Sequence, residues 1–132
     1  MKNITPDWNA PEHIHAFTTV RTGGVSQVPF DSFNLGDHVG DNPTDVQRNR
    51  QLLVERFGLP NFPLFLTQTH STRVIRLPHD GDNLEADAVY TNQPNQVCLV
   101  MTADCLPVLS IVKTEKNWRP LMPDGVVYAM VY

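Results

Sequence analysis

Residues 42–60 read NPTDVQRNRQLLVERFGLP, and this stretch carries the signals for both ends of one helix. Asn42 is a favourable N-cap, and Pro43 suits the first helical position, where its missing N–H needs no partner. The apolar residues on one stripe at helical spacing are Val46, Leu53 and Phe57. Gly58 can end the helix in a left-handed conformation. The sequence therefore predicts a helix that begins after Asn42 and ends at Gly58.

On both sides of this helix the sequence is typical of short strands joined by turns. The β-prone runs occupy residues 14–20, 64–69, 73–77, 88–90, 97–102 and 106–112. The run 97–102 is apolar nearly throughout, as in a strand covered on both faces. Residues 25–40 form a long irregular stretch, which a compact domain rarely keeps unless it serves a site. These patterns predict an α+β fold, sandwich-like, with a mixed β-sheet and flanking helices.

Length and composition indicate one domain over residues 1–132. The chain has 132 residues, a formal net charge of −4 and 41% hydrophobic residues, which suits one globular core and argues against disorder. The mild acidity argues against a nucleic-acid partner. The longest apolar runs are about five residues, whereas a membrane-spanning helix needs roughly 20. Cys98 and Cys105 cannot form a disulfide framework and are expected to be reduced thiols, so we expect a cytoplasmic protein without membrane contact.

Two residues that could carry chemistry lie at the ends of expected strands. His70 follows one strand-like run, and Cys105 follows another. They are too far apart in sequence for a local metal motif. The pair could be two zinc ligands, or a thiolate nucleophile with its base. The alternative is a buried thiol and an unrelated surface imidazole.

A second candidate region is the glycine turn at residues 21–26, RTGGVS. Its main-chain amides and the Arg21 guanidinium could hold a phosphate or a carboxylate. The alternative is that Gly23 and Gly24 simply make a turn. Asn34 further along is equally compatible with a side chain that caps its own loop.

Six motifs occur together in the order found in one known family. They are RTGGVS at 21–26, DSFNLG at 31–36, GDNP at 40–43, QTH at 68–70, EADA at 85–88 and TADCLPV at 102–108. In these motifs the chain resembles the YfiH-type proteins, also called the multicopper polyphenol oxidase (laccase-like) family and now understood as purine nucleoside phosphorylases. The resemblance covers about residues 15–112.

The resemblance implies a single-domain fold with a zinc site made by a His, a Cys and a second His. His70 and Cys105 would be the first two ligands and the catalytic residues. The implied reaction is phosphorolysis of adenosine, inosine, guanosine and methylthioadenosine, with adenosine deamination as a further activity. Purine nucleosides and phosphate would be the small-molecule partners, and the oligomeric state is left open. The residues we expect to bind substrate are Arg21, Asn34, Gln68 and Asp104. Zinc is expected rather than copper, because a multicopper cluster needs many imidazoles and the chain has five His.

Residues 113–132 depart from the family pattern. The third ligand would lie in a His-Ala-Gly-Trp-Arg-Gly motif, which this chain lacks. Codons permitted for residues 121–131, read one nucleotide earlier, spell that motif from the last base of Leu121 onward. We therefore predict that residues 113–132 are an out-of-frame tail, that the domain is incomplete, and that the β-prone residues 126–132 favour aggregation. Zinc binding and activity would be impaired. The alternatives are a Cys–His hydrolase, with Cys105 as nucleophile and His70 as base, and a non-catalytic remnant that binds nucleosides.

Overall fold

The computed structural model describes the backbone of residues 2–112 and 126–131. The chain divides into two compact units, Met1–Phe62 and Pro63–Tyr132. Each unit has its own secondary structure, and each is described by itself below.

The first unit contains a two-stranded ribbon and one helix. Strands β1 (Asn3–Ile4) and β2 (Thr18–Thr19) pair antiparallel. The run predicted over residues 14–20 thus forms a strand at only two positions. Irregular backbone occupies residues 25–40, as predicted.

Helix α1 (Pro43–Phe57) has the limits that its sequence predicts. The Asn42 side chain accepts a hydrogen bond from the Thr44 N–H (2.9 Å), which gives a partner to one of the free amides of the first turn. Gly58 takes the left-handed conformation (φ 59°), and its N–H bonds to the Val54 carbonyl. The helix buries four side chains, Val46, Asn49, Leu52 and Leu53.

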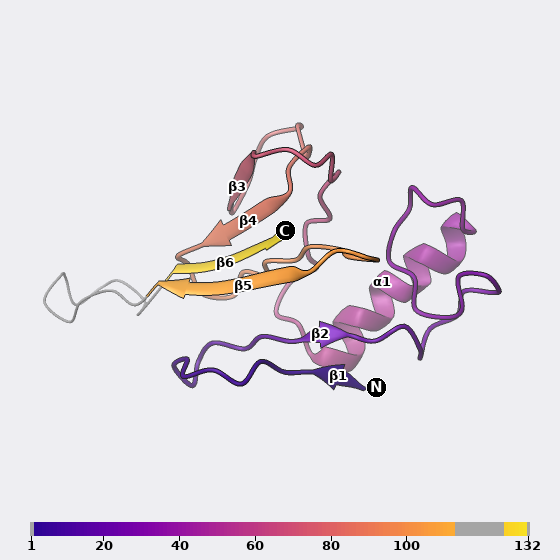
Figure 1. Ribbon diagram of the computed structural model, residues 1–132, viewed down its shortest axis with the longest axis horizontal. Helices are drawn as coiled ribbons and strands as arrows, with labels where there is room; N and C mark the ends of the chain where they lie inside the picture. Colours follow the sequence, from indigo (N-terminus) through magenta and orange to yellow (C-terminus); the bar gives the residue numbers. More distant parts are fainter. Residues whose placement is uncertain (1, 113–125, 132) are drawn as a thin grey trace, which may run out of the picture. The chain divides into compact units, whose positions relative to one another are not determined.

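The second unit is built on a four-stranded mixed sheet (Figure 1). Its strands are β3 (Val74–Leu77), β4 (Ala88–Thr91), β5 (Pro107–Val112) and β6 (Val126–Val131). Their spatial order is β3-β4-β6-β5, with β3 and β4 parallel and the other two pairs antiparallel. One helix and a mixed sheet confirm the predicted α+β class. Among residues 2–112 and 126–131, however, α1 is the one α-helix, where the sequence suggested more than one.

The core of the second unit follows from the alternation of strand β3. Ile75 and Leu77 are buried, whereas Val74 and Arg76 are exposed. The core cluster consists of Leu66, Ile75, Leu77, Ala86 and Val89. Cys98 packs against it as a partly buried neighbour. In the part of the chain that the structure describes, no helix is both long enough and apolar enough to cross a membrane.

Two predicted strands are absent from the described chain. Residues 64–69 contribute one isolated bridge, Thr67 to Glu85, and residues 97–102 form no strand. Both runs are apolar enough for strands, but a side chain replaces backbone pairing between them: Gln68 bonds to the Met101 main chain. Of the predicted out-of-frame tail, residues 113–125 and 132 lie outside the described residues. Residues 126–131 are strand β6, paired with β4 on one side and β5 on the other.

Candidate functional site

His70 lies in a tight turn that is fixed by a carboxylate from the next part of the chain. Its φ is 58°, a left-handed conformation that residues other than glycine rarely adopt. The backbone N–H groups of Thr69, His70 and Ser71 all donate to the Asp87 side chain, at 3.1, 3.1 and 2.8 Å. The Ser71 hydroxyl adds a fourth hydrogen bond to Asp87 at 3.0 Å. The turn therefore wraps around one anionic group.

The Asp87 carboxyl is buried and ionised. Its residue is 7% exposed. Burial by itself raises the pKa of a carboxyl, but the hydrogen bonds from Ser71, Thr69 and His70 outweigh that effect and hold the pKa of Asp87 below its usual value. The negative charge is thus stabilised by three backbone N–H groups and by the Ser71 hydroxyl. Asp87 received no role from the sequence, although its EADA motif was noted. The sequence feature that could have indicated its role is a single carboxylate between two alanines, Ala86 and Ala88.

Gln68 ties the segment that bears His70 to the segment that leads to Cys105. Its Nε2 donates to the Met101 carbonyl and its Oε1 accepts from the Met101 N–H, both at 2.7 Å. His70 is two residues beyond Gln68, and Cys105 is four residues beyond Met101. The structure therefore brings these two segments together. It also engages the Gln68 amide that was expected to bind substrate.

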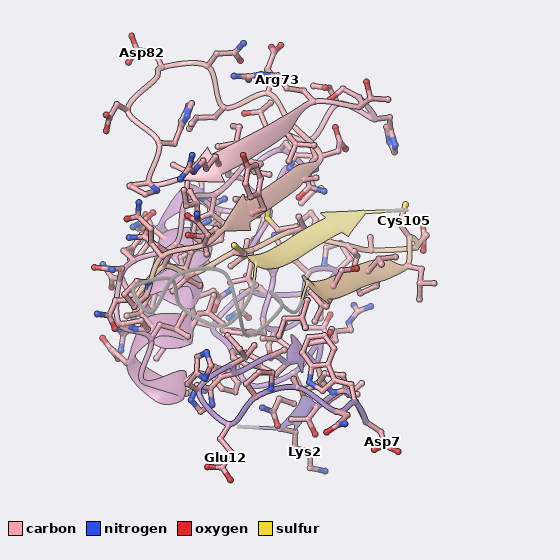
Figure 2. The ribbon with its side chains drawn as sticks, turned by 90° about the vertical axis from the view of Figure 1, so that its left-hand side faces the viewer. Lys2, Asp7, Glu12, Arg73, Asp82 and Cys105 are labelled. Carbon is pink, nitrogen blue, oxygen red and sulfur yellow. The ribbon has the colours of Figure 1, made fainter. Side chains whose placement is uncertain are left out.

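Cys105 and Asp104 are exposed in the bend that precedes β5. Figure 2 shows Cys105 at the end of the sheet where β5 begins. The other thiol differs in its environment, because burial raises the pKa of Cys98 to about 12. The exposed thiol is therefore the one available for a ligand or a metal, and the partly buried Cys98 thiol is expected to react slowly.

In the first unit, Arg21 is bound to its own loop but stays accessible. Its guanidinium donates to the carbonyls of Asp31 (2.7 Å) and Pro29 (2.9 Å) and meets the Asp31 carboxylate at 3.4 Å. The Arg21 side chain is 70% exposed, and these bonds use Nε and Nη2. Within residues 2–112, no hydrogen bond from Nη1 accompanies them, so this nitrogen can still donate to an anion.

The amides of the glycine turn, by contrast, are used by the protein itself. Gly23 and Gly24 both donate to the Ser32 hydroxyl, at 3.0 and 3.1 Å. Val25 donates to the Asn49 side chain (2.8 Å), and Ser26 donates to the Ser32 carbonyl (2.9 Å). These four N–H groups do not point at an open site. The turn interpretation of residues 21–26 therefore describes them better than an anion cradle.

Asn34 caps its own loop, which was the alternative to a substrate contact. It accepts from the Gly36 N–H and donates to the Gly36 carbonyl, both at 3.0 Å, and it donates to Asp41 at 3.1 Å. Asp41 also accepts from the Ser26 hydroxyl at 2.5 Å. The Ser26 bond, with those from Asn34 and the Asn42 amide, holds the pKa of Asp41 below its usual value against a smaller opposing effect of burial.

The donor atoms of His70 and Cys105 suit zinc, but two side chains are fewer than the three protein ligands of a catalytic zinc site. An imidazole nitrogen and a thiolate sulfur are both common zinc ligands, and a catalytic zinc site uses three protein ligands. Among residues 2–112 and the described strand β6, no group of three or more His, Cys, Asp or Glu side chains is arranged to hold a metal. The described chain thus offers two side chains whose donor atoms are of the types that zinc binds.

Comparison with known proteins places these residues in a family. The multi-copper polyphenol oxidoreductase laccase family matches residues 15–118. A protein of Haemophilus influenzae named purine nucleoside phosphorylase is 65% identical over 134 residues, which cover 96% of this chain and 54% of that protein. The Escherichia coli protein named purine nucleoside phosphorylase YfiH is 43% identical over 128 residues, covering 91% of this chain and 53% of the relative.

Solved structures show the same relationship to proteins of this kind. A Neisseria meningitidis protein superposes with a TM-score of 0.78 and 39% identity, over 98% of this chain and 49% of that one. A Bacillus licheniformis protein titled hypothetical protein YfiH superposes with a TM-score of 0.62 and 26% identity, over 83% of this chain and 42% of that one. The chain spans about half the length of the curated relatives it matches. It belongs to the multi-copper polyphenol oxidoreductase laccase family.

Proposed function

We propose that this chain carries part of a zinc-dependent purine nucleoside phosphorylase site, centred on His70 and Cys105. The observation that carries the proposal is its 65% identity with a relative named for that activity. The ordered turn at His70 and the exposed thiol of Cys105 support it, because they present a nitrogen and a sulfur donor on segments joined through Gln68 and Met101. Adenosine, inosine, guanosine and methylthioadenosine are the proposed nucleosides, with adenosine deamination as a second reaction.

In phosphorolysis a phosphate oxygen attacks the anomeric carbon of the ribose, and the bond to the purine nitrogen breaks. The purine leaves with the bonding electrons and needs stabilisation of that charge or a proton. His70 and Cys105 are the residues that would hold zinc, which supplies Lewis-acid stabilisation of developing negative charge when bound. Copper is the less suitable metal, since the whole chain has five His.

Anion binding is assigned to Arg21, because its guanidinium is exposed and keeps Nη1 outside its own loop contacts. Nη1 is the nitrogen left for this contact, because Nε and Nη2 already donate to the loop carbonyls. Asp104 is proposed to orient the nucleoside, since its carboxylate is exposed one residue before Cys105. Asn34 is a weaker candidate for this role, because its side chain already bonds to Gly36 and Asp41.

We also propose that residues 113–132 are read out of frame from a point near Lys113. Sequencing the gene tests this directly. The proposal requires codons beneath Met122 to Val127 that read His-Ala-Gly-Trp-Arg-Gly when shifted by one nucleotide, and any other codons overturn it. A shifted frame would remove the His of that motif, and zinc binding and turnover would then be weaker than those of a relative that keeps it.

The test uses the purified full chain with inosine and phosphate, and the Haemophilus influenzae relative as positive control. Release of hypoxanthine that a chelator abolishes and added zinc restores supports the proposal. Loss of activity with iodoacetamide but not with the chelator would instead support a Cys–His hydrolase. A thermal shift with inosine and phosphate but no product, with or without zinc, would identify a binding remnant and overturn the catalytic assignment.

A further inference from the structure

We propose that Asp87 is a positioning residue for His70: its carboxylate holds the turn at residues 69–71 and so sets the direction of the imidazole. The inference rests on the proposed function in one respect, namely that His70 is a site residue. It adds a residue to that site and assigns it a task other than contact with substrate or metal.

The two oxygens of Asp87 have separate tasks. Oδ1 accepts from the Thr69 N–H, the Ser71 N–H and the Ser71 hydroxyl, at 3.1, 2.8 and 3.0 Å. Oδ2 accepts from the His70 N–H at 3.1 Å. Oδ1 therefore holds the two ends of the turn, and Oδ2 holds the residue at its centre.

The conformation at His70 is what makes this arrangement informative. The His70 backbone has φ near +60°, which is strained for a residue that carries a Cβ atom. Glycine would adopt this conformation without that cost. Strained backbone at a residue other than glycine is concentrated at functional sites, where the surrounding structure imposes it. Here the three backbone N–H groups that donate to the Asp87 carboxylate hold the strained backbone in place. His70 therefore occupies a backbone conformation that favours glycine.

The backbone around Asp87 is anchored in the sheet, so its carboxylate can restrain the turn at residues 69–71. It lies between Ala86 (0% exposed) and Ala88 (8% exposed), and Ala88 begins strand β4. The Asp87 N–H donates to the Arg73 carbonyl at 3.2 Å, next to the start of β3. The carboxylate thus projects from backbone that is anchored in the sheet, whereas the turn that it holds is exposed. Motion of the turn is restrained by the core through one side chain.

The chain offers a variant that breaks the bond at the centre of the turn and a control that leaves this bond in place. Asp87→Asn can keep Oδ1 with its three partners while placing an NH₂ group opposite the His70 N–H. Ser71→Ala removes the hydroxyl that donates to Oδ1 and accepts from the Arg73 N–H (3.3 Å), and it leaves the His70 bond intact. Asp87→Asn also removes the negative charge that strengthens the remaining bonds, whereas Ser71→Ala keeps that charge, and Asp87→Asn alone loosens the centre of the turn. A merely structural role predicts similar behaviour for the two.

The first measurement is the zinc chloride concentration that half-protects the Cys105 thiol against iodoacetamide in the full chain. Asp87→Asn is expected to raise this concentration about 10–100-fold, as loss of a residue that orients a metal ligand does, and Ser71→Ala by less than about threefold. Slow modification of Cys98 serves as the internal check that the core stays folded. Equal changes in the two variants would overturn the proposal.

The second measurement is the amide order parameter of His70 by ¹⁵N relaxation, which needs no metal and no activity. We expect a rigid value of about 0.85 in the wild-type chain and a value below about 0.6 in Asp87→Asn, with Ser71→Ala close to wild type. If zinc fails to protect Cys105 in the wild type, the proposed metal site fails, and the order parameters still decide the role of Asp87. A mobile His70 amide in the wild-type chain overturns the inference even if Asp87→Asn does not fold.

Discussion

The Gln68 side chain and the Met101 backbone exchange two hydrogen bonds of 2.7 Å each, so a side-chain amide pairs with main chain as a neighbouring strand would. This exchange joins the segment of His70 to the segment that leads to Cys105. The energetic worth of the pair and its effect on the two segments can be measured separately.

Gln68→Ala should lower the free energy of unfolding by about 1–3 kcal/mol, because two partly buried backbone groups lose their partner. The Met101 amide should exchange its hydrogen faster, since Gln68 is the acceptor for it. Urea denaturation and amide exchange check both. The control is Gln93→Ala, an exposed glutamine of the same unit, with an expected change within about 0.5 kcal/mol. An unchanged Met101 exchange rate would contradict this account.

Asn49→Ala should be among the most damaging substitutions in the first unit. The Asn49 side chain is fully buried, accepts from Val25 and donates toward Ser26, Ser32 and Asn34. Its removal leaves several buried polar groups without partners, at a cost of about 3 kcal/mol or more in unfolding free energy. Gln47→Ala on the exposed face of α1 is the control and should change stability by less than about 0.5 kcal/mol. Similar melting curves for the two variants would refute the prediction.

Gly24→Ala tests the close packing of the glycine turn. An added Cβ would lie 2.3 Å from the Ser32 carbonyl oxygen, 2.4 Å from Asn49 Oδ1 and 2.7 Å from the Phe33 Cα. Two of these neighbours are backbone atoms that cannot move aside, so we expect a loss of at least about 3 kcal/mol.

Gly58→Ala is the matched control for Gly24→Ala. A Cβ there meets nothing within 4 Å, but the residue has φ +59°, so backbone strain alone should cost about 1–2 kcal/mol. Thermal unfolding of the two variants gives the comparison. A smaller loss for Gly24→Ala than for Gly58→Ala would show that the turn can open.

Acid should weaken the first unit through Asp41. The Ser26 hydroxyl, with Asn34 and the Asn42 amide, lowers the pKa of this carboxyl in the folded protein. Its stabilising contribution is therefore complete above the unfolded-state pKa of about 3.9 and disappears as the pH falls through the lower folded-state value. Denaturation midpoints measured between neutral and acidic pH should fall less steeply in Asp41→Asn than in the wild type. Parallel slopes would count against the role of Asp41.

The two thiols should differ sharply toward iodoacetamide. With its pKa raised to about 12 by burial, Cys98 is thiolate in roughly one molecule in ten thousand at pH 8, and only the thiolate is nucleophilic. Cys105 is exposed. Intact-mass analysis should show one fast modification, located on Cys105 by peptide mapping, and the Cys105→Ser variant should lack it. Fast labelling of Cys98 would show that the core opens easily.

The sequence alone determined the elements whose signals are local. Helix α1 has the predicted ends because Asn42 and Gly58 satisfy their own neighbours within a turn. Strand β3 follows from alternation at Ile75 and Leu77, and β5 follows from a continuous apolar run. Six ordered motifs resemble those of one family, and residues 15–118 match that family.

The tertiary structure decided which polar groups find each other. Gln68 and Met101 are 33 residues apart, Val25 and Asn49 are 24 apart, and His70 and Asp87 are 17 apart. Periodicity describes what one segment buries, but not which distant side chain will accept its N–H groups. For that reason the sequence predicts strands at 64–69 and 97–102, leaves the glycine turn open between a plain turn and an anion site, and gives Asp87 no role. A hydrogen bond between distant segments forms only after folding has removed water from the donor and the acceptor. Each polar group then needs the other as its partner.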